Sequence, residues 1–82
     1  MKEILKTKII LVGEQQGDIE EFDTCWKAYE RYQEIKDFDK RNHILDKYTF
    51  EFRYTYKDEP NIEYTKGMKI YRRRNKLFYK FI

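Results

Sequence analysis

Ten consecutive residues, 48–57, alternate aromatic and polar side chains without a break. A period of two places neighbouring side chains on opposite faces of a strand, so this segment predicts a β-strand with one buried and one wet face. Residues 62–73 and 77–82 are predicted to be strands too, separated from it and from each other by turns at 58–61 and 74–75. Pro60 presets φ in the first turn, and Asn75 tolerates the left-handed conformation expected in the second. Gly67 suggests a bulge or a bend.

An amphipathic helix is predicted over residues 19–35, because its apolar side chains recur three or four positions apart. Asp18 is expected to be the N-cap, with Glu21 at capping-box spacing and acids in the first turns suiting the macrodipole. The apolar face of this helix consists of Ile19, Phe22, Cys25, Trp26, Tyr29 and Tyr32.

The first predicted strand, 4–12, is apolar on both faces in its second half, which is typical of a central strand. Residues 13–18 and 36–47 are predicted loops. We expect Phe38, Ile44 and Leu45 to fold back from the second loop onto the core. The order β-α-β-β-β predicts a single α+β domain over residues 1–82, with one amphipathic helix packed on a small, mainly antiparallel sheet.

One helix covers only one face of such a sheet, so the other face is expected to carry exposed apolar side chains. Ile10 and Val12 would contribute from the first strand, and alternate residues of 77–82 from the last. A contiguous apolar patch usually marks an interface, which predicts a homodimer or a docking surface. The alternative is that residues 36–47 fold over this face.

Charge is distributed unevenly along the chain. Residues 14–46 carry ten acids and five bases, and residues 62–82 carry seven bases and one acid. We interpret the acidic helix region as an ordinary solvated face. The basic hairpin has three interpretations: contact with nucleic acid, contact with an acidic protein or a small nucleotide, and a solvated turn whose cations deter edge aggregation. The candidate partner-binding residues are Lys69, Tyr71, Arg72, Arg73, Arg74, Lys76, Phe78 and Tyr79.

Catalytic and metal-binding patterns are weak. The chain has no Ser, and its one Cys (Cys25) and one His (His43) do not make a zinc set. The Asp37-x-Asp39 spacing begins like a calcium loop, but Arg41 stands at its fifth position. The Gly13–Gly17 loop lacks the lysine of a phosphate loop. Three carboxylates that could meet for acid–base chemistry, although no pattern selects them, are Glu14, Asp18 and Glu63. We predict no enzyme, no cofactor and no metal.

The function predicted from these features is that of a small non-enzymatic binding protein. Enrichment in Lys, Ile, Tyr, Asn and Phe indicates a low-GC genome, and with the small size it favours a phage or mobile-element protein that inhibits or sequesters a host protein or defence component. The alternative is a nucleic-acid-binding accessory protein that uses the basic hairpin. A lone Cys, with no signal peptide and no membrane span expected, predicts a cytoplasmic protein without a membrane partner.

Overall fold

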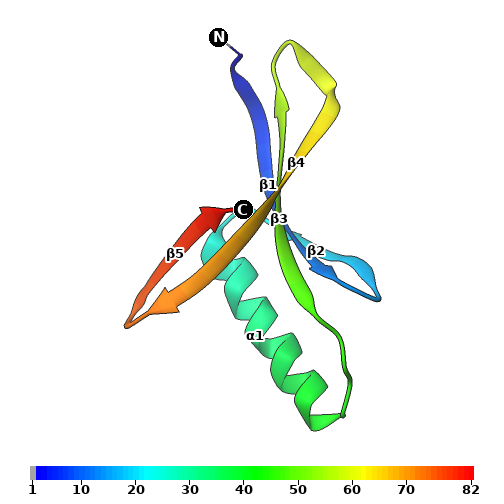
Figure 1. The fold of residues 1–82 in the computed structure, drawn as a ribbon. Helices are drawn as coiled ribbons and strands as arrows, with labels where there is room; N and C mark the ends of the chain where they lie inside the picture. Colours follow the sequence, from blue (N-terminus) through cyan, green and yellow to red (C-terminus); the bar gives the residue numbers. More distant parts are fainter. Residues whose placement is uncertain (1) are drawn as a thin grey trace.

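The computed structural model describes residues 2–82, which form a five-stranded antiparallel sheet with one helix against it (Figure 1). The α+β class and the packing of one helix on the sheet are confirmed. The predicted β-α-β-β-β succession is present, with one additional strand, β2, before the helix. The strand order in the sheet is β2-β1-β3-β4-β5. The elements are β1 (Ile4–Gly13), β2 (Gly17–Phe22), α1 (Cys25–Arg41), β3 (Tyr48–Tyr56), β4 (Glu59–Arg73) and β5 (Lys76–Phe81).

The additional strand corrects the predicted start of the helix. Ile19 and Phe22 belong to β2, which pairs antiparallel with β1 and places Phe22 opposite Ile9. The helix is capped by Thr24, whose hydroxyl oxygen accepts a hydrogen bond from the Lys27 N–H at 3.3 Å. Asp18 is therefore not the N-cap, and no acid lies in the first turn of α1.

The helix also continues six residues beyond its predicted end, to Arg41. Asn42 is the C-cap, His43 has a positive φ of 55°, and the Ile44 N–H bonds to the Asp39 carbonyl at 2.9 Å. This is the Schellman ending of a helix. The expectation that Phe38, Ile44 and Leu45 fold onto the core is wrong. They lie at the far end of the helix, and Leu45 is 88% exposed.

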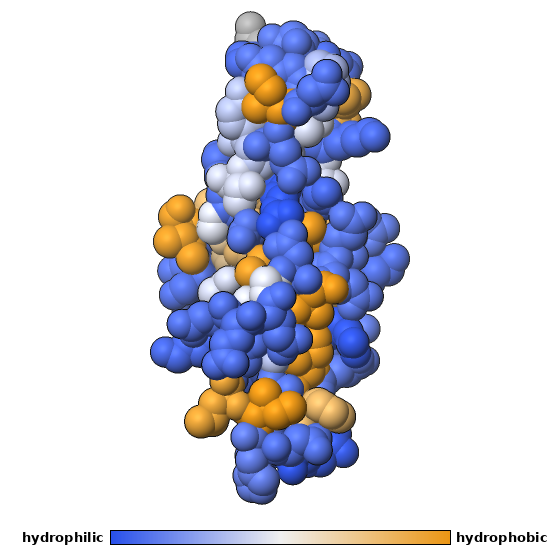
Figure 2. All heavy atoms as spheres, turned by 90° about the vertical axis from the view of Figure 1, so that its right-hand side faces the viewer, coloured by the Kyte–Doolittle hydropathy of each residue, from blue (hydrophilic) through white to orange (hydrophobic). Residues whose placement is uncertain are grey.

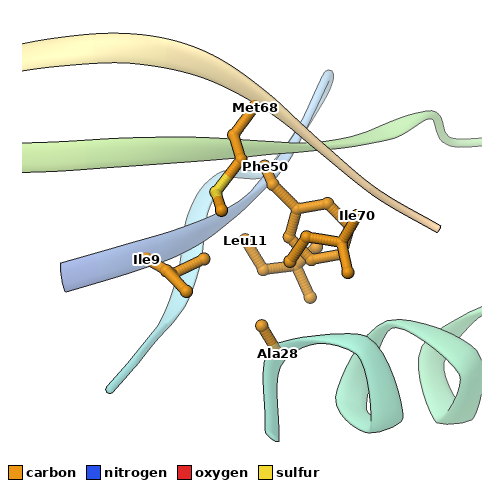
Figure 3. Close-up of a cluster of buried hydrophobic side chains, with 6 residues drawn as sticks. All are labelled: Ile9, Leu11, Ala28, Phe50, Met68 and Ile70. Atoms are coloured by element: carbon orange, nitrogen blue, oxygen red, sulfur yellow. The ribbon is translucent and has the colours of Figure 1, made fainter. Parts of the chain in front are cut away.

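The core lies between α1 and the face of the sheet that the helix covers (Figure 3). It consists of Ile9, Leu11, Ala28, Phe50, Met68 and Ile70. Cys25, Tyr29 and Tyr32 pack against it from the helix, as predicted. Trp26, predicted for the same face, is 47% exposed. The core side of the helix is set by Ala28 and Tyr32, and at 3.6 residues per turn Trp26 points well away from them.

The opposite face of the sheet does not present the apolar patch expected from β1. Ile10 is only 3% exposed, between its cross-strand neighbours Glu21 and Glu51, and Val12 is half-buried. Ion pairs of Lys8 and Arg53 with carboxylates of β2, β3 and β4 lie beside it. Of the exposed apolar residues near the C-terminus, Phe78 lies on this face, whereas Tyr79 and Phe81 alternate to the helix side.

Three strands continue beyond the helix as an arm, seen in the upper part of Figure 1. The arm consists of residues 4–8, 53–56 and 59–66, because β2 pairs only with Ile9–Gly13 of β1 and β5 only with Met68–Arg73 of β4. Gly67 pairs regularly with Glu51, so the predicted bulge there is absent. In Figure 2 the arm is mostly hydrophilic, and apolar side chains gather in the lower half of that face.

Candidate functional site

The basic segment forms a tight hairpin of β4 and β5. The pairing runs from Met68 opposite Phe81 to Arg73 opposite Lys76, and Arg74 and Asn75 make the two-residue turn. The positive φ, 56°, is at Arg74 and not at Asn75 as expected. Both favoured two-residue hairpin turns need φ above zero at the first central position, and one of them needs it only there; here that position falls on Arg74.

Arg74 lies in the turn, and the other seven predicted binding residues divide between the two faces of this hairpin. Arg72 and Tyr79 share the helix side with Ile70, which is in the core. The residues on the side away from the helix, together with Lys80, are called the hairpin surface. It consists of Lys69, Tyr71, Arg73, Lys76, Phe78 and Lys80. Lys80 was not among the predicted residues, although its spacing of two from Phe78 places it on the same face.

Two stacked aromatic rings lie at the centre of the hairpin surface. The Tyr71 and Phe78 ring centroids are 5.7 Å apart with an angle of 22° between the ring planes. The guanidinium carbon of Arg73 lies 5.7 Å from the Tyr71 centroid. Lys69 and Lys80 face each other on one side of the rings, and Arg73 and Lys76 on the other. The rings therefore form a platform between two pairs of cations.

The hairpin cations have no carboxylate partner. Within residues 2–82, none of the Lys and Arg side chains of β4, β5 and their turn from residue 69 onward takes part in an ion pair. Arg72 instead braces the turn, because its Nε donates to the Arg74 carbonyl at 3.2 Å and its Nη2 to Asn75 Oδ1 at 3.4 Å. The positive charge of this surface is thus available to an external anion.

The acidic region lies elsewhere than predicted. The helix, Cys25–Arg41, has five bases and four acids, whereas residues 14–23 have five acids and no base. The acids of β2 are paired: Asp18 with Arg53 at 2.8 Å, Glu20 with Arg31 at 3.1 Å. Because β2 and β5 are the two outer strands, negative and positive charge lie at opposite edges of the sheet.

A groove of about 920 Å³ follows the open edge of β1 between the helix and the arm. Four of its five cations are matched by acids: Lys27 pairs with Asp23 at 3.2 Å and Arg31 with Glu34 at 3.1 Å, and Lys8 and Arg53 are paired as well. Sequence reasoning missed this groove, because its existence depends on where β2 stops. Its mutually paired charges make it a poorer anion site than the hairpin surface.

The residues considered for catalysis are not assembled into a catalytic group. Cys25 is half-buried, and burial raises the pKa of its thiol. Asp18 and Glu63 do meet, but on the guanidinium of Arg53, which holds the pKa of Asp18 below its ordinary value. Within residues 2–82 no cluster of three or more potential metal ligands is present.

No protein-family model matches the chain, and the comparisons with curated proteins and with solved structures also return no match. Among the helical residues that the structure describes, none belong to a helix that is long and apolar enough to cross a membrane.

Proposed function

We propose that this protein is a non-enzymatic binding protein of the cytoplasm, and that its hairpin surface binds single-stranded nucleic acid. The observation that supports the proposal is the stacked Tyr71–Phe78 pair, flanked by cations that form no ion pair within residues 2–82. Proteins that bind single strands combine such aromatic platforms with a positive surface that follows the phosphates.

The layout of the surface suits an extended strand. Phe78 is 42% exposed, so part of its ring is open to a base. Four residues of β-strand span about 14 Å, so Lys69 and Arg73 can contact phosphates on either side of a stacked base. No acid stands in either strand of the hairpin between residues 68 and 81 to repel a phosphate.

The test is fluorescence anisotropy with labelled single-stranded DNA and RNA at several salt concentrations. Phe78→Ala removes a stacking ring and is expected to cost about 1–3 kcal/mol of binding free energy. Lys69→Ala with Lys80→Ala is expected to weaken binding and to reduce the salt dependence, because fewer counterions are released. Lys40→Ala with Lys47→Ala removes the same charge outside the hairpin and serves as the matched control.

Binding that ignores salt, or equal losses in the hairpin and control variants, would contradict the proposal. So would the absence of binding to every single-stranded probe while the protein is folded.

A second candidate is the inhibitor function predicted from the sequence, in which the same hairpin occupies an acidic surface of a host protein. The observation that favours it is that β5 is an outer strand whose free edge could pair with a partner's strand. This candidate expects a protein, not an oligonucleotide, to co-purify with the wild type. It also expects replacement of Arg72, Arg73 and Arg74 together by Ala to abolish that capture without unfolding the protein.

A further inference from the structure

The outer edge of β5 is open along its whole length, because β5 is the last strand of the sheet formed by residues 2–82 (Figure 1). The Ile82 N–H donates to the Gly67 carbonyl at 2.9 Å, so Ile82 directs its backbone groups toward β4. The pairing of β5 with β4 is regular throughout. Backbone groups alternate between the two sides of an antiparallel strand, so Leu77, Tyr79 and Phe81 direct their N–H and C=O groups to the open edge.

We infer that this edge pairs with the same edge of a second copy of the chain, antiparallel across a two-fold axis at Tyr79. In this register Tyr79 lies opposite Tyr79 of the second copy, and Leu77 lies opposite Phe81. All three residues direct their backbone groups outward, so the two edges exchange six hydrogen bonds. A two-fold contact closes on itself and gives a dimer in which the two sheets become one.

This register leaves room for the strands of both copies. The second β5 lies two strand positions from the first β4, and the second β4 lies one position farther out. Beyond Ile82 the arm of the first copy has an empty strand position, about 4.8 Å wide, between it and the Arg74-Asn75 turn of the second copy. By symmetry the same holds for the other arm.

Charge selects the register among those that match the outward backbone groups. Shifting one strand by two residues places either Lys76 opposite Lys80 or Lys80 opposite Lys80, and like charges directly opposite are destabilising. Each of these shifts also leaves four hydrogen bonds in place of six. The register centred on Tyr79 instead places Lys80 opposite Phe78 and Lys76 opposite Ile82.

Side chains on the helix side of the sheet match across the axis. A band of rings runs from Tyr54 to Phe52 at 5.8 Å, from Phe52 to Phe81 at 5.2 Å and from Phe81 to Tyr79 at 5.8 Å. It ends at the open edge, where Tyr79 is 57% exposed. A second copy continues the band, since Tyr79 then meets Tyr79 and Leu77 meets Phe81. The edge is thus self-complementary, which identifies a second copy as its occupant.

Salt separates this inference from the proposed function, on which it does not rest. Residues 68–81 carry six cations and no acid, so two hairpins repel each other and added salt screens the repulsion. The dimer is expected to tighten at least about twofold as NaCl rises from about 50 to about 500 mM, whereas binding to nucleic acid weakens. Dimerisation is measured without nucleic acid, so either proposal can fail while the other stands.

The experiment is sedimentation equilibrium of the full chain from about 1 μM to about 1 mM, a range that spans weak to moderate dimers. The wild type is expected to approach twice the chain mass of 10.4 kDa. A wild type that stays at the monomer mass throughout, or a dimer that loosens as salt is added, would overturn the inference.

Two variants test the axis. Tyr79→Lys and Tyr79→Glu each place like charges opposite each other and remove a ring pair, so each alone is expected to dimerise about tenfold more weakly than the wild type. An equimolar mixture places opposite charges at the axis and is expected to associate at least about fivefold more tightly than either variant alone. Mixing cannot rescue a folding defect. Equal association of the mixture and the separate variants would contradict the two-fold register.

A disulfide trap locates the contact. Residues in a hydrogen-bonded pair have Cα atoms about 5.5 Å apart, within disulfide range. In a Cys25→Ala background, Tyr79→Cys is therefore expected to give an oxidised covalent dimer. Ile62→Cys is the matched control, because Ile62 is similarly exposed, at 49%, but lies on the arm, away from the axis. Cross-linking of both variants to the same extent would refute pairing at β5.

Discussion

At the scale of single residues, the most constrained contact is the one between Tyr48 and Asp39. Within residues 2–82, Asp39 is the one charged side chain that is buried. The Tyr48 hydroxyl donates a hydrogen bond to its carboxylate and accepts one from Gln16 Nε2 at 3.4 Å. Loss of solvation, together with Asp39, raises the pKa of Tyr48 to about 12, so the hydroxyl remains a donor at neutral pH.

Tyr48→Phe should therefore destabilise the fold. The buried carboxylate loses its donor, and an unsatisfied buried group costs about 1–3 kcal/mol. Urea unfolding monitored by tryptophan fluorescence measures this loss. Tyr56→Phe is the matched control, since the Tyr56 hydroxyl makes no hydrogen bond within residues 2–82, and the change in stability should stay within about 0.5 kcal/mol. Equal effects of the two substitutions would show that Asp39 is satisfied without Tyr48.

The residue types at the hairpin were predictable from sequence. Which of them share a face depends on the alternation of side chains along each strand. Arg72 and Tyr79 were predicted with the others, although they alternate to the helix side. Lys80 was omitted, although it shares a face with Phe78. The stacking of Tyr71 on Phe78 depends on the pairing register between the two strands, which a hairpin turn at Arg74-Asn75 does predict.

At the scale of elements, the long alternation of residues 48–57 predicted β3 correctly, whereas β2 was assigned to the helix. The reason is a register shift in the β1–β2 pairing between Leu11 and Val12. This irregularity breaks the alternation of β2, and Ile19 and Phe22 are then left at a spacing of three that imitates a helix face. The helix itself was recognised from the spacing of Cys25, Tyr29 and Tyr32, which do share its buried side.

The end of the helix gives a prediction at this scale. His43 has a φ of 55° in the Schellman ending, a conformation that costs a residue with a side chain about 1 kcal/mol and glycine almost nothing. His43→Gly relieves this cost and is expected to stabilise the protein by about 0.5–1 kcal/mol. The gain is no larger because the greater freedom of glycine in the unfolded chain opposes it. Thermal unfolding measures the change. His43→Ala retains the unfavourable φ and should give no such gain, so equal melting temperatures for the two variants would contradict the explanation.

At the scale of the whole molecule, the fold class was predictable and the arm was not. The arm exists because β2 and β5 each cover only half of the strand that they pair with. Strand lengths at the edges of a sheet are set by where turns and bulges fall, and these leave weak signals in a single sequence. The groove and the open edge of β4 follow from the same lengths.

The ion pairs of the whole surface predict a loss of stability in acid. The pKa values of Asp18, Asp23 and Glu59 are lowered, chiefly by hydrogen bonds from Arg53, Lys27 and Lys2 respectively. A carboxyl group with a lowered folded-state pKa stabilises the fold above its ordinary pKa of about 4, and this contribution is lost as the pH falls through the lowered value.

The urea midpoint should therefore change little between neutral pH and about pH 5 and fall below about pH 4. Asp18→Asn removes one of the titrating groups and should make that fall shallower. Because Asp18 and Asp23 are exposed, added salt should also reduce the fall. A midpoint that rises on acidification would contradict this account.

The position of β1 has a consequence for synthesis of the chain. Its apolar run, Ile9–Val12, leaves the ribosome before the strands that pair with it, and β3, which covers its second edge, begins 35 residues after β1 ends. At about 5–20 residues per second, the nascent protein holds that run uncovered on one edge for a few seconds. Lys6 and Lys8, beside the run, act as charged gatekeepers against association between nascent chains during this interval. Slow codons placed before Tyr48 would lengthen this interval and would give chaperones more time to bind.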